Sequence, residues 1–438
     1  MQRILLYFKQ VWNLLRQEKL FSTIYILGTG LSITLVMTLS VVFYIKIAGV
    51  YPETNRGRTL TVCYIAERNK DGRGYSSSRM SLQMFEACFK TLTKAETVSA
   101  EMMPESNENY VQPEGSRMQL PVTVKYVDPE WWNVFNFRFG EGAPFTEADF
   151  QSGITVAVIS KSLANRLYGD EGAVGKSLSL NFRRFKVCGV VDDVSFLTSS
   201  SYAQIWLPYT VADKNDLNSF GSKTGSLGRF TAIILAPSAA EVEPVKQEFL
   251  ARFRRYSSQY ADEVTIIIPS QPLRQWEKMF FRYNLEDENF NYYLWLYGIV
   301  FFALMLVPAI SLSGMADSRL ERRLSEMGVR RAYGAKISSL MNQILLENFI
   351  FTLLGGIVGL CFAYFVVLTG KDWIMGIGSH GMPSQTDGWG VTISPSMLFN
   401  IHVFLLALAV CFLLNLFSAL IPAWKASRHQ IIESLNLK

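Results

Sequence analysis

Residues 319–335 read RLERRLSEMGVRRAYGA, a basic and helix-prone stretch that lies between two long apolar runs. Short loops with such an excess of Lys and Arg are retained on the cytoplasmic side of a membrane. The stretch also carries apolar residues at helical spacing, so it predicts a patterned cytoplasmic helix that receives energy or a signal from a partner. Its cationic residues, with the one just beyond its end, are Arg319, Arg322, Arg323, Arg330, Arg331 and Lys336.

The composition of the 438-residue chain is that of a membrane protein. It is 49% hydrophobic and only 18% charged, whereas soluble domains carry about 25% charged residues. The length allows roughly two to three domains. The net charge of +5 comes from the flanks of the apolar runs. Because the basic residues do not alternate with stacking aromatic residues along one stripe, nucleic acid is not an expected partner.

Four apolar runs are each long enough to cross a membrane, which takes about 20 helical residues. The first run is too long for the core of a signal peptide, and no Ala-x-Ala cleavage site follows it, so we expect it to be retained. A fourth of the chain is thereby assigned to helices that cross lipid. The predicted transmembrane helices are residues 21–48, 291–314, 344–369 and 398–422.

Charge on the flanking segments orients these helices. The basic residues concentrate in segments 1–20, 315–343 and 423–438, whereas loop 370–397 carries only Lys371 against two aspartates. Both termini and the middle loop are therefore expected inside, and residues 49–290 outside. Segment 1–20 has one apolar helical face and is predicted to lie on the inner leaflet as an interfacial helix. The chain is thus predicted to be a multi-pass protein of the inner (cytoplasmic) membrane with a large periplasmic domain.

The outer region, residues 49–290, is predicted to be an α+β domain of two lobes. A strand–helix–strand pattern occurs at each end of it, and the two patterns are expected to pair into one split lobe, residues 50–105 and 225–275. Residues 106–224 form an inserted mixed lobe, and the Gly/Ser-rich stretch 221–228 is predicted to be a mobile link back. The expected strands are 59–67, 97–103, 120–127, 154–159, 204–208, 229–235 and 263–268, with a hairpin at 177–191. The expected helices are 79–93, 129–135, 160–168 and 241–256.

One stretch imitates a nucleotide-binding loop. Residues 170–177 read DEGAVGKS, which ends like a phosphate-binding loop. That loop needs a strand before it and a helix after it, so that backbone amides face the phosphates. Here a predicted helix precedes and a predicted strand follows. The stretch is therefore interpreted as a turn between a helix and a hairpin.

No catalytic, cofactor or metal site is predicted. The three histidines have no metal-ligand spacing, and Ser160 has no His or Cys partner in a recognisable arrangement. Asp192 and Asp193 are adjacent after a strand and would face opposite ways, so a turn is the better interpretation than an acid/base pair. Cys63, Cys88 and Cys188 are interpreted first as small buried hydrophobic residues, with a disulfide among them left open.

The third predicted span carries a face for close helix packing. Gly355 and Gly359 are spaced as in a GxxxG pattern, with Gly356 beside them. Small residues at this spacing allow two helix backbones to approach closely. The pattern does not indicate whether the neighbouring helix belongs to the same chain or to a second copy.

Several segments together resemble ABC-transporter permeases of the MacB/FtsX/LolE type. The basic stretch followed by LLENFIFTLLGGIVGL (345–360) is similar to their loop and third span, and ALIPAWKASRHQIIESLN (419–436) is similar to their closing pattern. Residues 127–150, 154–180 and 185–194 are similar to the MacB-like extracytoplasmic core. The chain departs from the pattern at Ser325, where many members carry a basic residue, and at Gln430 or Ile431, where a proline is usual.

The resemblance implies a dimer of four-span subunits, with a second permease copy or a paralogue, above an ABC ATPase. About 20 residues precede the first span, too few for an ATPase domain, so the ATPase is expected on a separate polypeptide and the chain itself is not expected to be an enzyme. Membrane lipid and a periplasmic adaptor are further partners that the resemblance allows. It also implies that a coupling helix rests on the ATPase through Glu326, Gly328, Arg330, Arg331 and Gly334.

The predicted function is a permease subunit that transmits ATP-driven movement to the outer side, for efflux or extraction of a substrate. Two alternatives stay within the family: a regulator that activates a cell-wall hydrolase without transport, and a lipoprotein-releasing permease. A third, an isolated extracytoplasmic sensor, predicts that no ATPase is involved. The simpler interpretation of the arginines, as a topology signal in contact with lipid headgroups, would not require the Glu-Met-Gly-Val-Arg-Arg-Ala pattern of residues 326–332.

Overall fold

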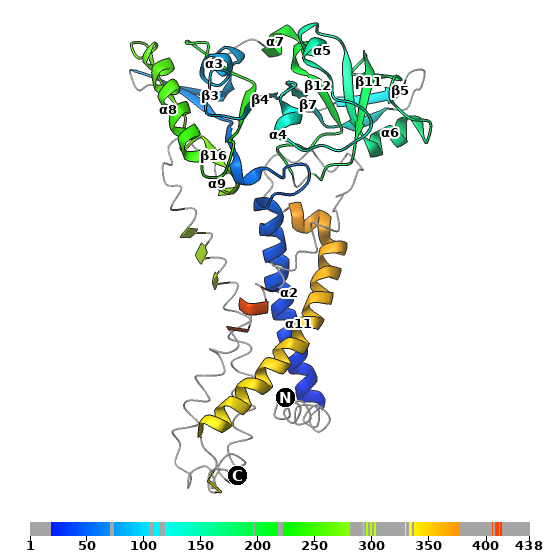
Figure 1. The fold of residues 1–438 in the computed structure, drawn as a ribbon, viewed down its shortest axis with the longest axis vertical. Coiled ribbons are helices and arrows are strands. Elements are labelled where there is room, and N and C mark those ends of the chain that lie inside the picture. The colour runs from blue at the N-terminus through cyan, green and yellow to red at the C-terminus, as the bar shows by residue number, and fades with distance from the viewer. Residues whose placement is uncertain are drawn as a thin grey trace. The chain divides into compact units, whose positions relative to one another are not determined.

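The computed structural model describes seven continuous ranges of the chain and a few single positions near residues 292–334 and 405–413 (Figure 1). The continuous ranges are 19–70, 74–104, 109–113, 119–195, 198–217, 222–280 and 337–376. The chain divides into a helical unit, residues 1–44, 294–375 and 395–438, and an α+β unit, residues 45–293 and 376–394. Each unit is described by itself.

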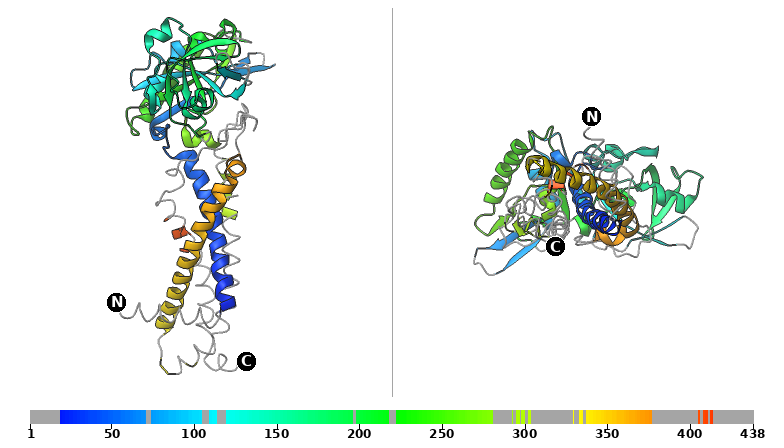
Figure 2. Two further views of the ribbon diagram at one scale, coloured as in Figure 1. Left: turned by 90° about the vertical axis from the view of Figure 1, so that its right-hand side faces the viewer. Right: turned by 90° about the horizontal axis from the view of Figure 1, so that it is seen from below.

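The helical unit contains two long helices. Helix α2 (Lys19–Ile47) and helix α11 (Ile337–Gly376) run side by side and cross, as Figures 1 and 2 show. Residues Ser22–Val41 of α2 and Phe349–Thr369 of α11 are long and apolar enough to span a membrane. These are the first and third predicted spans. Helix α11 begins inside the predicted segment 315–343 and extends past residue 369, because neither flank contains a proline that would end a helix.

The other predicted membrane segments lie largely outside the described residues. Of segment 291–314 the structure describes seven helical positions, and of segment 398–422 it describes six. The interfacial helix predicted for residues 1–20 falls outside the described part except for its last two positions, which belong to α2. Loop 370–397 is described only to residue 376, and tail 423–438 lies outside altogether.

The described strands of the α+β unit form one sheet of 16 strands, in the order β15-β2-β3-β14-β4-β7-β12-β9-β11-β10-β5-β6, with β1, β8, β13 and β16 joined to its sides. The strands are β1 (Thr59–Val62), β2 (Ile65–Asn69), β3 (Tyr75–Met80), β4 (Thr97–Met102), β5 (Asn109–Pro113), β6 (Leu120–Val122), β7 (Val124–Val127), β8 (Phe139–Gly142), β9 (Val156–Ser160), β10 (Ser177–Leu180), β11 (Arg183–Val191), β12 (Ile205–Pro208), β13 (Leu227–Gly228), β14 (Phe230–Leu235), β15 (Val264–Ile267) and β16 (Leu273–Arg274). The helices are α3 (Leu82–Cys88), α4 (Trp131–Val134), α5 (Glu147–Gln151), α6 (Lys161–Tyr168), α7 (Lys214–Leu217), α8 (Val242–Ser258) and α9 (Gln275–Phe280), with 3-10 turns η1 (Arg56–Arg58) and η2 (Tyr209–Val211).

We keep the name split lobe for residues 50–105 and 225–275. Strand β14 lies at its centre, with all six residues buried, and pairs antiparallel with β4 along its whole length and with β1 on the other side. Helix α8 packs one apolar face on the sheet, with buried residues at the three- and four-residue spacing of an amphipathic helix. Phe249 of α8 contacts Phe89 with ring centroids 4.6 Å apart, so α8 and the end of α3 share one aromatic core.

We keep the name inserted lobe for residues 106–224. Its own hydrophobic core contains only residues between Val111 and Val211. Two parallel pairs, β9 with β11 and β7 with β12, form its centre, and α6 covers them. Ser160 caps α6 through its hydroxyl, which accepts a hydrogen bond from the backbone N–H of Leu163 at 3.4 Å.

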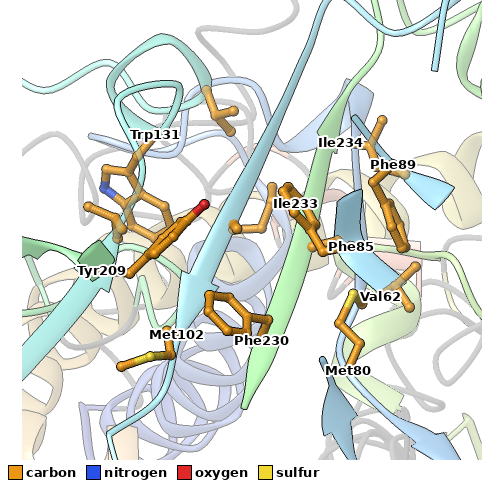
Figure 3. Packing of buried hydrophobic residues seen from close by; sticks show 14 of the residues in the cluster. Val62, Met80, Phe85, Phe89, Met102, Trp131, Tyr209, Phe230, Ile233 and Ile234 are labelled. Atoms are coloured by element: carbon orange, nitrogen blue, oxygen red, sulfur yellow. The ribbon is translucent and has the colours of Figure 1, made fainter. Parts of the chain in front are cut away.

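The two lobes share the sheet through a short ladder. Strand β4 pairs with β7 at two positions, Glu101 with Val127 and Met102 with Tyr126. Figure 3 shows Trp131 and Tyr209, from the inserted lobe, beside Met102 and Phe230 of the split lobe. The sheet and this shared cluster therefore join the two lobes.

Several details of the α+β unit differ from the sequence-based expectation. The predicted strand 59–67 is two strands, β1 and β2, and the predicted strand 120–127 is β6 and β7. The helix predicted over residues 79–93 covers only α3, because Ser81 caps its start by accepting a hydrogen bond from the backbone N–H of Met84 at 3.1 Å. Strand β3 precedes it; its run of serines has no alternating apolar pattern, so it was not predicted.

The stretch 222–228 is not a free link. The hydroxyls of Ser222, Thr224 and Ser226 all donate to the carboxylate of Glu67 in β2, which is only 4% exposed. The prediction of a mobile link used local composition alone, and composition cannot show a buried carboxylate that lies more than 150 residues away in the chain.

Candidate functional site

The predicted coupling segment is described at one of its five residues. Glu326, Gly328, Arg330 and Arg331 lie outside the described part of the chain, whereas Gly334 lies inside it. The backbone N–H of Tyr333 donates to the oxygen of Val329 at 3.1 Å, which is the spacing of a helical turn. Gly334 follows with φ +90°, and no heavy atom lies within 4 Å of the position its Cβ would occupy. A glycine in this left-handed region ends a helical turn, and α11 begins three residues later.

The glycines of α11 lie against two different neighbours. A Cβ on Gly355 would lie 2.0 Å from the hydroxyl oxygen of Thr29 in α2, and one on Gly359 would lie 2.6 Å from the backbone oxygen of Gly30. A Cβ on Gly356 would instead lie 2.7 Å from a methyl carbon of Leu408, in the predicted fourth span. Gly355 and Gly359 thus face α2 of the same chain, which is the alternative that the pattern by itself left open.

A threonine completes the seam between α2 and α11. The hydroxyl of Thr34 donates both to the oxygen of Gly30, at 2.8 Å, and to the oxygen of Gly359, at 3.1 Å. In lipid such a bond between helices contributes modestly, about 0.6 to 1.7 kcal/mol. Sequence reasoning missed the α2 side, although Gly28-Thr29-Gly30 within an apolar run is the corresponding small-residue signal.

The acidic side chains singled out in the α+β unit have structural partners. The carboxylate of Asp193 accepts from the backbone N–H of Ser162 at 2.9 Å, at the start of α6, and Asp192 lies beside it in the same connection. Residues 170–176 connect α6 to β10 as turns. Among the residues that the structure describes, no group of three or more His, Cys, Asp or Glu is arranged to hold a metal ion.

The pKa values of two buried carboxyl groups are shifted in opposite directions. Burial raises the pKa of Asp128 to about 7, even though Ser99 and Ala100 donate hydrogen bonds to it. For Glu67, burial also opposes ionisation, but the hydrogen bonds from Ser222, Ser226 and Thr224 outweigh it and lower the pKa. Both groups are fully engaged in holding strands and loops together, and neither is placed for acid/base chemistry on a ligand.

Burial favours the protonated form of two thiols of the α+β unit. Cys63, Cys88 and Cys188 are all free, so the disulfide left open by the sequence is not formed. Burial raises the pKa of the Cys88 thiol to about 12 and that of Cys188 to about 11. Because the thiolate is the reactive form, these cysteines pack as small apolar groups.

Two family models match the chain. Residues 22–252 match the MacB-like periplasmic core domain, which covers more than half of the chain, and residues 298–431 match the FtsX-like permease C-terminal domain. The first match includes α2 and most of the α+β unit, and the second includes α11 and the predicted coupling segment.

Named relatives are similar over about seven tenths of the chain. The uncharacterized ABC transporter permease YknZ of Bacillus subtilis is 22% identical over 318 residues, which cover 73% of this chain and 70% of that protein. The macrolide export ATP-binding/permease protein MacB of Marinobacter nauticus is 25% identical over 327 residues, which cover 69% of this chain and 42% of that protein. The match therefore spans about two fifths of the length of that MacB protein.

Solved structures of outer domains also match. The extracellular domain of YknZ, at 16% identity and a TM-score of 0.33, covers 48% of this chain and 99% of its own. The periplasmic region of MacB from Actinobacillus actinomycetemcomitans, at 18% identity and a TM-score of 0.33, covers 49% of this chain and 92% of its own.

Proposed function

This chain belongs to the family of ABC transporter permeases that combine a MacB-like periplasmic core domain with an FtsX-like permease domain, and we propose that it transmits ATP-driven movement from a separate ATPase subunit to the periplasmic side. This movement drives efflux or extraction of a substrate by the α+β unit, outside the inner leaflet. The chain acts as a multi-pass protein of the inner membrane, paired with a second permease copy or a paralogue.

The observation that supports this proposal is the continuous route from the start of α11, through its contact with α2, to the α+β unit. Helix α11 runs for 40 residues without interruption, about 60 Å at 1.5 Å per residue. It starts beside the Gly334 turn and is seated on α2 through backbone contacts at Gly355 and Gly359. Helix α2 in turn continues in the chain directly into the α+β unit. Movement at the start of α11 therefore has a stiff route, because the contact is made by short or β-branched side chains and backbone atoms of α2.

The coupling contact itself is proposed to consist of Glu326, Gly328, Arg330, Arg331 and Gly334. The two arginines offer fixed positive charge and forked donors, which suit carboxylates on a partner. The Gly334 turn separates this contact from α11, so that the short helix and the long helix can meet at an angle. Electrostatic complementarity of this kind mainly sets partner choice and association rate.

The proposal is tested by association with the ATPase encoded beside this chain. In lipid nanodiscs, the combined variant Arg330→Glu and Arg331→Glu is expected to lose ATPase association by at least tenfold. The matched control is Arg319→Glu with Arg322→Glu, which makes the same change of charge in the same loop outside the coupling residues, and should bind as the wild type does. The proposal fails if the wild-type chain binds no ATPase, or if the first variant binds as well as the second.

A further inference from the structure

The residues that follow α2 are bonded to the inserted lobe, although residues 50–56 belong in sequence to the split lobe. We call residues 48–56 the stem segment; it belongs wholly to the α+β unit. Each residue from Tyr51 to Asn55 makes a hydrogen bond with the inserted lobe. Three of these bonds are Arg138 N–H to the Tyr51 hydroxyl (3.2 Å), Asn136 N–H to the Pro52 oxygen (3.0 Å) and the Asn55 amide to the Val134 oxygen (3.1 Å).

A buried ion pair lies at the centre of the stem segment. The carboxylate of Glu53 contacts Arg56 at 2.7 Å, and each side chain is only 2% exposed. Arg56 also donates to the backbone oxygen of Ala48 at 2.8 Å, so it closes the segment on itself. Burial opposes ionisation of Glu53, but the charges of Arg56 and Lys278 and the bond from Ser201 outweigh it, so the pKa of Glu53 is lowered.

The other carboxylate oxygen of Glu53 holds a loop of the inserted lobe. It accepts hydrogen bonds from both the backbone N–H and the hydroxyl of Ser201, each at 2.9 Å. The backbone oxygen of Ser201 in turn accepts from the indole N–H of Trp206, at 3.2 Å. Trp206 lies fully buried in β12, next to the parallel centre of the inserted lobe. One carboxylate thus connects the stem segment in two steps to Trp206, a member of the buried cluster that the two lobes share.

Helix α9, near the other end of the α+β unit in sequence, contacts the same loop, residues 198–201. Lys278 of α9 donates to the hydroxyl of Ser200 at 2.9 Å. Helix α9 is the last continuous helix described before the predicted second span, residues 291–314. Residues 198–201 therefore contact both the stem segment that follows α2 and α9, a helix that also packs on β1 and β16. The split lobe has its own separate anchor: Arg58 donates to the Ala236 oxygen at 2.9 Å and pairs with Glu96.

We infer that loop 198–201 is the point at which movement of the spans enters the outer domain, with Glu53 and Lys278 as its positioning residues. The inserted lobe then moves first with the membrane stems, and the split lobe follows through the β4–β7 ladder and the buried cluster that the two lobes share. This inference rests on the proposed function, because it requires that the spans move during the ATPase cycle. It adds which lobe is driven and through which side chains.

A variant that lacks the Glu53–Arg56 ion pair would not distinguish a loss of transmission from a loss of folding. Glu53→Gln leaves the Arg56 charge buried without its counter-ion, a change that commonly destabilises proteins strongly. The milder test is Ser201→Ala combined with Lys278→Met, which removes one bond from each stem and leaves the ion pair intact. Arg58→Met is the matched control, since it removes a cation of the same unit that bonds to Asn55, Glu96 and the backbone oxygens of Ala236 and Pro237 rather than to loop 198–201.

The measurement is the distance between spin labels at exposed Lys161 on α6 and exposed Gln247 on α8, recorded with and without ATP in the full complex in nanodiscs. Labels enter as an unnatural amino acid, because the chain has 5 cysteines of its own. The nucleotide-dependent change is expected to fall at least twofold in the Ser201→Ala, Lys278→Met variant, with ATPase rate unchanged, and to persist in Arg58→Met.

The possible results distinguish a failure of the proposed function from a failure of the inference about loop 198–201. If the wild-type distance does not respond to ATP, the proposed function itself is wrong. If the wild type responds and the double variant responds equally, the proposed function stands and the entry point at loop 198–201 is overturned. Equal losses in the double variant and in Arg58→Met would also overturn it, because the effect would then be general to the domain.

Discussion

The hydroxyl of Thr34 donates a hydrogen bond to the backbone oxygen of Gly359, at 3.1 Å, and joins two helices across 325 residues of sequence. A side-chain hydroxyl can reach a backbone oxygen of a neighbouring helix only where the two helices lie unusually close. Gly355 and Gly359 allow this closeness, because neither has a Cβ and atoms of α2 occupy the space that a Cβ would need. At this seam the backbones of α2 and α11 therefore approach each other closely.

Gly359→Leu is expected to separate α2 from α11. Even a Cβ would lie 2.6 Å from the Gly30 oxygen, and overpacking of this kind costs about 1–3 kcal/mol. Thermal unfolding of the full chain in detergent should show a lower midpoint. Gly298→Ala is the control, since nothing lies within 4 Å of its Cβ position. A Gly359→Leu chain as stable as the control would contradict the seam.

Thr34→Val keeps the shape of the side chain and removes its hydroxyl. We expect a loss of about 0.6 to 1.7 kcal/mol, the range of hydrogen bonds between membrane helices, measured by the same unfolding experiment. Thr23→Val offers a comparison within α2, because the Thr23 hydroxyl bonds to the Lys19 oxygen of its own helix and to no other residue that the structure describes. The Thr23 change should have the smaller effect, and the reverse order would show that Thr34 acts within α2 alone.

Gly334→Ala is expected to weaken coupling without changing any packing contact. The site is open, so the penalty comes from forcing a Cβ into the left-handed region at φ +90°, about 1–2 kcal/mol. Stimulation of the partner ATPase by the reconstituted chain should fall. Gly334→Asn should recover part of the loss, since Asn tolerates this backbone conformation better. If Ala and Asn behave alike, the turn has no conformational role.

Glu248 should stabilise the split lobe in a pH-dependent way. Burial opposes its ionisation, but hydrogen bonds from Thr93, Lys94 and Arg252 outweigh it and lower the pKa to about 2. The unfolded carboxyl titrates near about 4.3. The contribution is therefore fully present above that pH and is lost as the pH falls towards about 2.

The check is the unfolding midpoint of the wild type and of Glu248→Gln between neutral pH and pH near 2. The difference between the two should be largest at neutral pH and should shrink through the acid range. Glu243→Gln, on the same helix but with only Gln247 as its hydrogen-bond partner among those described, should track the wild type. A difference that stays constant with pH would mean that Glu248 acts through packing alone.

Elements with strong local patterns could be predicted from the sequence. Hydropathy located α2 and the membrane part of α11, and helical spacing located α8 almost to its ends. The strand β14 was predicted because all six of its residues are apolar or β-branched and are bounded by turn signals. In each case the information lies within one segment, and burial on one face is enough to fix the element.

The missed features depend on partners that are distant in the sequence. Strand β3 consists mostly of serines and is placed by its pairing with β2 rather than by its own pattern. The Ser201 loop is fixed by Glu53, 148 residues earlier. The GxxxG pattern indicated a close contact, but its partner, Gly30, became evident only once α2 and α11 were seen together. Four of the five proposed coupling residues remain a prediction, because they lie outside the described part of the chain.

The stem segment also determines where the outer domain can be cut as a soluble fragment. A fragment starting at Thr59, where β1 begins, would delete Glu53 and expose the Ser201 loop that its carboxylate holds. A fragment ending before α9 would remove Lys278 as well. The smallest self-contained piece therefore runs from Ala48 to Phe280, and shorter versions are expected to be aggregation-prone even though they keep every long strand.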